Sequence, residues 1–219
     1  MQIQLTTIRF PEIQLATRDA HKLRGYFGNL FKEHSPLLHN HFENGTFRYQ
    51  YPLVQYKVIH QTPVLLGINE GGQLLVNLFL DIHEIKLNDQ VFPVYQKNID
   101  NRHVTIGVNE ELYHYRFETL WMGLNQDNFR KYARLEEDDK KPFLQKILIG
   151  NILSFFKSLD FRIDQKILIN SGLAEKQTQF KNKQMLAFTG DFYSNALLPS
   201  MVGLGKAVSR GFGTINQQK

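Results

Sequence analysis

The stretch "GLGKAVSRGFG", residues 203–213, places four glycines in eleven positions near the end of a 219-residue chain. Glycine tolerates positive backbone φ angles and lets amide groups approach an anion closely. No Gly-Lys-Ser/Thr of a P-loop is present at the required spacing, and no strand, loop and helix with a downstream acid mark a dinucleotide-binding fingerprint. Two interpretations remain: a loop that contacts a phosphate backbone through Lys206, Ser209 and Arg210, or a glycine-rich turn that permits tight packing. The glycines are Gly203, Gly205, Gly211 and Gly213.

Composition sets the protein class. An apolar content of 42% with 12% aromatic residues is typical of a folded globular protein, and the length allows one domain or two small ones. The absence of cysteine excludes disulfides, thiolate nucleophiles and cysteine-based zinc sites. The N-terminal residues lack the layout of a signal peptide and no apolar run is long enough to span a bilayer, so the sequence predicts a soluble, cytoplasmic protein.

The net charge of +5 is modest, but its distribution is uneven. No acid follows Asp191, whereas Lys206, Arg210 and Lys219 all lie in that final stretch. Acids gather instead in "RLEEDDKK", residues 134–141, which is typical of a solvated helix start or a linker. The basic excess therefore coincides with the glycine-rich stretch and is compatible with a polyanionic partner.

Hydrophobic periodicity predicts the elements of each half of the chain. In the first half it predicts strands at 2–9, 46–60, 63–69 and 84–96 and helices at 19–32 and 70–82; the apolar stripe of the first helix is Ala20, Leu23, Phe27, Leu30 and Phe31. In the second half it predicts strands at 112–124, 165–174, 183–194 and 211–215, helices at 125–132 and 138–159, and a helical turn at 195–201.

Both halves thus read strand, helix, strand, strand, helix, strand. This order predicts an α+β protein built from two βαββαβ units, with antiparallel sheets backed by helices. We place the domains at residues 1–100 and 101–219. No residue-level repeat supports the duplication, which rests on element order alone.

A second group of chemically active residues lies in "HSPLLHNHFENGTFRYQY", residues 34–51. His39 and His41 are two apart in a polar loop, and Tyr49 and Tyr51 share one face of the predicted strand. Imidazoles exchange protons near neutral pH, so one group can accept the 2′-hydroxyl proton of RNA while another protonates the departing 5′-oxygen. The alternative is a surface loop that happens to contain histidines, with Tyr51 as a core aromatic.

Other residues allow weaker interpretations. A zinc site on His34, His39 and His41 would need Glu33 or Glu43 as a further ligand, and we do not favour it. Four more histidines, which are His21, His60, His83 and His114, are scattered without evident partners. The aromatic group Tyr113, Tyr115, Phe117 and Trp121 suits either base stacking or, with more weight, the core.

Taken together, "GLGKAVSRGFGTI", the preceding "FTGDFYSNALLPSMV", "HNHFENGTFRYQYPLVQYKVI" and "PVLLGINEG" resemble the CRISPR-associated endoribonuclease family that cuts precursor CRISPR RNA within its repeats. The resemblance implies tandem ferredoxin-like (RRM-like) domains and a glycine loop that binds RNA. It implies a cut without metal or cofactor that leaves a 2′,3′-cyclic phosphate and a 5′-hydroxyl. By motif, His39 and His41 correspond to the family's catalytic histidines, and Tyr49 or Tyr51 to a tyrosine found soon after them.

The resemblance also names the partners. CRISPR repeat RNA is the expected ligand, and a homodimer and association with subunits of a CRISPR effector complex are compatible with it. The competing hypothesis is a non-catalytic repeat-RNA-binding subunit with the same fold, and a third is a metal-dependent nuclease. The histidine pair favours the endoribonuclease, because a protein that only binds RNA does not need it.

Overall fold

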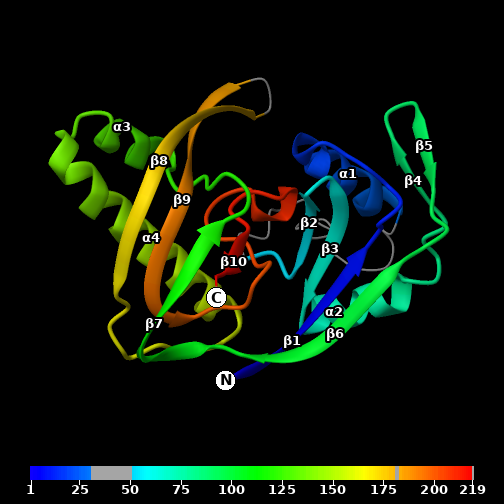
Figure 1. Ribbon diagram of the computed structural model, residues 1–219, viewed down its shortest axis with the longest axis horizontal. Helices are drawn as coiled ribbons and strands as arrows, with labels where there is room; N and C mark the ends of the chain where they lie inside the picture. Colours follow the sequence, from blue (N-terminus) through cyan, green and yellow to red (C-terminus); the bar gives the residue numbers. More distant parts are fainter. Residues whose placement is uncertain (31–50, 181–182, 219) are drawn as a thin grey trace, which may run out of the picture. The chain divides into compact units, whose positions relative to one another are not determined.

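The protein is described from a computed structural model, which covers residues 1–30, 51–180 and 183–218 (Figure 1). The chain forms two compact units. The N-terminal unit comprises Gln2–Val104 together with Ser209–Gly211. The C-terminal unit comprises Met1, Thr105–Val208 and Phe212–Lys219. Each unit is a mixed α/β fold with one four-stranded sheet, so the fold class predicted from the sequence is confirmed.

The N-terminal unit has the sheet order β2-β3-β1-β6, in which β3 pairs antiparallel with both β1 and β2. This is the strand order of a ferredoxin-like βαββαβ unit. Its elements are β1 (Gln2–Arg9), a 3-10 turn (Thr17–Asp19), α1 (Ala20–Leu30), β2 (Val54–Ile59), β3 (Thr62–Ile68), α2 (Glu70–Leu78), β4 (Glu84–Leu87), β5 (Gln90–Pro93) and β6 (Asn98–Thr105).

The fourth sheet strand differs from the prediction. Residues 84–96, predicted as one strand, form the separate hairpin β4–β5. The fourth strand of the sheet, beside β1, is β6 instead. The reason is a two-residue turn at Asn88 and Asp89, where Asn88 has a φ of 53°. Positive φ angles at asparagine are favoured in such tight hairpin turns.

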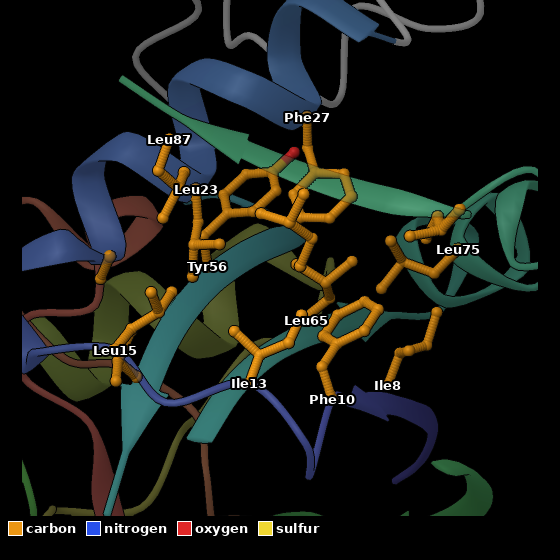
Figure 2. Close-up of a cluster of buried hydrophobic side chains, with 14 of the residues drawn as sticks. Ile8, Phe10, Ile13, Leu15, Leu23, Phe27, Tyr56, Leu65, Leu75 and Leu87 are labelled. Atoms are coloured by element: carbon orange, nitrogen blue, oxygen red, sulfur yellow. The ribbon is translucent and has the colours of Figure 1, made fainter. Parts of the chain in front are cut away.

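The core of this unit forms where α1 packs on the sheet (Figure 2). The ring of Phe27 on α1 stacks at 6.2 Å from Phe10 and at 6.0 Å from Tyr56 on β2. Ala20 and Leu23 of the predicted stripe are also buried, whereas Leu30 is exposed and Phe31 lies outside the described residues. Each fully buried apolar side chain stabilises the unit by roughly 1.5–3 kcal/mol.

The C-terminal unit has the sheet order β10-β7-β9-β8, again the ferredoxin-like order. Its elements are β7 (Gly107–Phe117), α3 (Gln126–Tyr132), α4 (Glu137–Ser158), β8 (Ile169–Phe180), β9 (Lys183–Leu197) and β10 (Ile215–Gln217). The two predicted helices and the antiparallel β8–β9 pair are confirmed. The predicted helical turn at 195–201 is wrong, because β9 continues to Leu197. A segment with one 3-10 turn (Val208–Arg210) then leads to β10.

The predicted strand at 112–124 also ends earlier than expected. β7 stops at Phe117, after which Trp121 forms an isolated bridge with Phe188 on β9. This bend buries Trp121 completely and places its ring 5.6 Å from Phe117. Tyr115 is buried as well, so the core interpretation holds for these three aromatics, while the fourth, Tyr113, is half-buried. Within the described residues, no helix is long and apolar enough to cross a membrane.

Candidate RNA interface

The glycine loop, residues 203–213, is shaped by close packing within the protein itself. Gly205 (φ 89°) lies so close to Trp121 that an added Cβ would be 2.7 Å from the indole Nε1. A Cβ on Gly213 (φ 66°) would overlap the carbonyl oxygen of Leu204. The two residues are also joined by a hydrogen bond of 2.8 Å, which the Leu204 amide donates to the Gly213 carbonyl. The interpretation as a tightly packed glycine turn therefore applies at these two positions. A fixed loop of this kind also presents its side chains at defined positions.

Lys206 is the exposed cation of the loop. Its backbone amide donates to the carbonyl of Met122 at 2.9 Å, and the next residue, Ala207, has a φ of 55°. The backbone on both sides of Lys206 is therefore constrained, while its side chain reaches solvent. An exposed ammonium on a fixed backbone is suited to contact a phosphate.

Ser209, Arg210 and Gly211 belong to the N-terminal unit, although they come from the far end of the chain. A Cβ at Gly211 would lie 2.8 Å from the Cβ of Ala20 on α1 and 3.2 Å from the carbonyl oxygen of Tyr56 on β2. Ser209 and Arg210 are half-buried and Gly211 is buried. This part of the loop is thus seated on α1 and β2.

Two arginines lie where Ser209–Gly211 pack on α1 and β2. Burial lowers the pKa of the Arg210 guanidinium, and the charge of Arg24 on α1 lowers it further. Burial also lowers the pKa of Arg24. The effect of Arg24 on Arg210 indicates that two half-buried guanidinium groups lie near each other here.

Two cations of this unit were not found by sequence reasoning. Arg24 occupies an ordinary helical position, so no local pattern distinguished it. Lys57 lies on β2 and is fully buried, which lowers the pKa of its ammonium to about 7. A lysine within "VQYKVI", a strand that is otherwise apolar except for Gln55, is a detectable signal, because lysines are almost never fully buried.

The predicted catalytic segment is only partly described. His39, His41 and Tyr49 lie outside the described residues, as do His34 and the two glutamates of the zinc alternative. Tyr51 is described and half-buried, and its hydroxyl accepts a hydrogen bond of 2.9 Å from Gln55 Nε2. This hydrogen bond fixes the Tyr51 phenol just before the start of β2. The catalytic assignment of all four residues stays a prediction.

The expectation that the scattered histidines lack partners is wrong for His21 and His114. The Nδ1 atom of His21 lies 2.6 Å from the carbonyl oxygen of Arg18. His114 on β7 has partners: its Nε2 lies 3.3 Å from Asp191 Oδ1, and its ring stacks on Tyr193 at 4.5 Å. Both partners lie on β9, and the cross-strand register that joins them could not be derived from the sequence.

Comparison with known proteins covers both units. The family description "Cas6b N-terminal domain" matches residues 1–105, and "Cas6b C-terminal domain" matches residues 107–218. A crystal structure of Cas6b is similar to this chain, with 35% sequence identity and a TM-score of 0.95. A crystal structure of a CRISPR RNA processing endoribonuclease Cas6b has 33% identity and a TM-score of 0.82. Both alignments cover 100% of each chain. An uncharacterized protein of Methanocaldococcus jannaschii is 36% identical over 141 residues, which are 63% of this chain and 95% of that protein.

Proposed function

The chain belongs to the Cas6b family, and from this premise we propose that it binds precursor CRISPR RNA and cleaves it within the repeats to give mature CRISPR RNAs. The observation that carries the proposal is the likeness to a CRISPR RNA processing endoribonuclease, which extends over the whole chain at 33% identity. The histidine pair supports the catalytic version of this function over a purely binding one.

The proposed reaction uses the RNA's own 2′-hydroxyl. One of His39 and His41 accepts the proton of the 2′-hydroxyl, whose oxygen attacks the adjacent phosphorus. The bond from phosphorus to the 5′-oxygen breaks, and the other histidine protonates that oxygen. The products are a 2′,3′-cyclic phosphate and a 5′-hydroxyl. Tyr49 or Tyr51, or a nearby cation, stabilises the charge that develops on the phosphate.

In this proposal the two parts of the chain have different tasks. Residues 1–100 carry the chemistry, and residues 101–219 supply the glycine loop that holds RNA. Lys206, Ser209 and Arg210 contact phosphates, while Gly203, Gly205, Gly211 and Gly213 keep the loop in a shape that lets the backbone approach. The proximity of Arg210 to Arg24 supports this assignment, because it places two positive charges next to the glycine loop.

Salt dependence of binding tests the loop. Replacing Lys206 or Arg210 by alanine should weaken RNA binding and reduce the slope of log K against log salt by about 0.7 to 1 for each phosphate that is no longer neutralised. The measurement is fluorescence anisotropy with labelled repeat RNA over a series of salt concentrations. Lys146→Ala removes an exposed lysine from α4 and is the matched control, which should keep the slope of the unaltered protein. A slope unchanged in the loop variants would mean that the loop does not touch the RNA backbone.

The reaction class is tested by product chemistry. Purified protein is incubated with end-labelled repeat RNA in excess EDTA, and the ends of any product are analysed. We expect cleavage to continue, with 5′-hydroxyl ends that a kinase can label directly and cyclic phosphates that open in acid. Binding without cleavage would identify the alternative, a non-catalytic RNA-binding subunit of an effector complex. Cleavage that EDTA abolishes would identify a metal-dependent nuclease.

Assembly is a separate part of the proposal. The family resemblance is compatible with a homodimer and with association with effector-complex subunits. Light scattering on the purified protein, with and without repeat RNA, distinguishes the monomer from the dimer. Co-purification with effector subunits tests the second association.

A further inference from the structure

The two faces of the C-terminal sheet differ in chemistry. One face is apolar: Tyr115, Phe117 and Phe192 are buried on it. The other face carries His114 and Arg116 on β7 and Asp191 and Tyr193 on β9. We call this second surface, together with Asn170 and Gly172 on β8 and Asn216 on β10, the open face; the register pairs these residues directly across the strands.

Two aromatic rings on the open face are already stacked. The rings of His114 and Tyr193 are 4.5 Å apart and only 12° from parallel. Asp191 fixes this arrangement, since its carboxylate lies 3.3 Å from His114 Nε2 and accepts hydrogen bonds from Arg116 Nε at 2.8 Å and Nη2 at 3.3 Å. The hydrogen bonds from Arg116 also hold the pKa of the Asp191 carboxyl below its usual range, so it stays charged. The stack is therefore held in place before any ligand arrives.

One side of the Tyr193 ring lies against His114, and the residue remains partly exposed. Tyr193 is 44% exposed, and its neighbour on β8 is Asn170, also exposed. The next residue on the same face of β8 is Gly172, opposite Asp191, and a Cβ built there meets nothing within 4 Å. Gly172 also has no positive φ, so neither backbone conformation nor packing requires glycine here. Glycine leaves β8 without a side chain at the position on this face that follows Asn170, the cross-strand partner of Tyr193.

We propose that the open face is a second RNA-binding site, in which a nucleobase of single-stranded RNA stacks on Tyr193 above Gly172. Every base has a π-face that an aromatic ring can bind, and exposed aromatics on ferredoxin-like sheets bind RNA in this way. The exposed amide of Asn170 and the guanidinium of Arg116, which is 54% exposed, supply donors beside the ring for base edges or a phosphate. These polar neighbours fit RNA better than an apolar protein segment. The inference rests on the proposed function only in taking RNA as the partner.

The test measures binding of a short fluorescein-labelled oligouridylate by anisotropy. Tyr193→Ala should weaken affinity by about 5- to 150-fold, the range that one stacked base contributes, whereas Tyr193→Phe keeps the ring and the affinity. Because stacking involves no counterion release, the dependence of affinity on salt should keep its slope. An unchanged affinity in Tyr193→Ala would overturn the proposal.

Gly172→Val provides an independent test that leaves the Tyr193 ring intact. Valine is a good strand residue and its Cβ has space, so the variant should fold with an unchanged or higher Tm, yet its branched side chain blocks the position beside Tyr193. The matched control is Gly150→Val, at an exposed position of α4 where an added Cβ also meets nothing within 4 Å. We expect weaker binding in the first variant and normal binding in the second. Equal affinities in the two glycine variants would overturn the proposed position.

Failure of this inference is distinguishable from failure of the proposed function. If repeat RNA is cleaved but Tyr193→Ala and Gly172→Val bind oligouridylate as the unaltered protein does, the proposed RNA site on the open face is wrong and the proposed endoribonuclease function is retained. If the protein cleaves nothing but these variants bind more weakly, the RNA site stands and the catalytic proposal fails. Single-turnover cleavage at saturating protein should be unaffected by Gly172→Val, because saturation compensates for weaker binding.

Discussion

Alanine at His39 or His41 is expected to slow single-turnover cleavage of repeat RNA by about 10²–10⁴-fold, the usual contribution of a general acid or base. The affinity for the same RNA should remain near that of the unaltered protein, because a proton-transfer group contributes mainly in the transition state. The rate of cleavage and the dissociation constant must be measured separately, the latter with RNA that carries a 2′-deoxy group at the scissile position.

The dependence of the rate on pH sharpens this prediction. A base and an acid acting together give a bell-shaped profile, and each alanine variant should lose one limb of it. His83→Ala, at an exposed position of the N-terminal unit, is the matched control and should keep both limbs and the full rate. If both His39→Ala and His41→Ala lose RNA affinity in proportion to rate, the two histidines bind RNA and the catalytic assignment is wrong.

The parts of the fold that the sequence predicts well are those with one buried face. α4 is an example in type and bounds, since a helix is predicted at 138–159 and forms at Glu137–Ser158. Its inward face is predicted less well: of the expected apolar residues only Ile152 and Phe156 are buried, whereas Leu153 is 41% exposed and Phe143, Ile147 and Ile149 are half-buried. β6 is the opposite case: all but one of the residues in "NIDNRHVT" are exposed, although the strand lies at the edge of the sheet beside β1. A strand solvated on both faces has no alternating pattern, so its hydrogen-bonded position is not visible in the sequence.

The candidate sites divide in the same way. The glycine loop and the histidine segment are recognisable because unusual residue types stand close together in the sequence. The His114, Asp191 and Tyr193 cluster depends instead on the register of β7 against β9, and a shift of one residue would place these side chains on the buried face. The seat of Ser209–Gly211 on α1 and β2 is likewise a long-range contact, which local patterns do not encode.

The second large effect is expected at Lys57, whose burial should make stability depend on pH. Burial lowers the pKa of the Lys57 ammonium from 10.5 to about 7 in the folded protein. Between these two values the unfolded chain binds the proton and the folded chain does not. Because the unfolded state then holds more protons, the free energy of unfolding rises with pH in this window, by up to about 1.4 kcal/mol per pH unit. Below pH 7 both states are protonated and the dependence ends.

Urea unfolding at a series of pH values from 7 to 9.5 measures this slope directly. The upper limit stays below the pH at which tyrosines of the unfolded chain ionise. Burial raises the pKa of Tyr56 and Tyr115 in the folded protein, so at higher pH these two residues would add a slope of opposite sign. Lys57→Met retains a long apolar side chain without the titrating group, so the difference in unfolding free energy between it and the unaltered protein should change steadily with pH. Lys146→Met, which removes a surface lysine from α4, should follow the unaltered protein. Parallel pH profiles for Lys57→Met and the unaltered protein would mean that Lys57 remains charged in the folded state, with enough stabilising interactions to offset the loss of water around its ammonium.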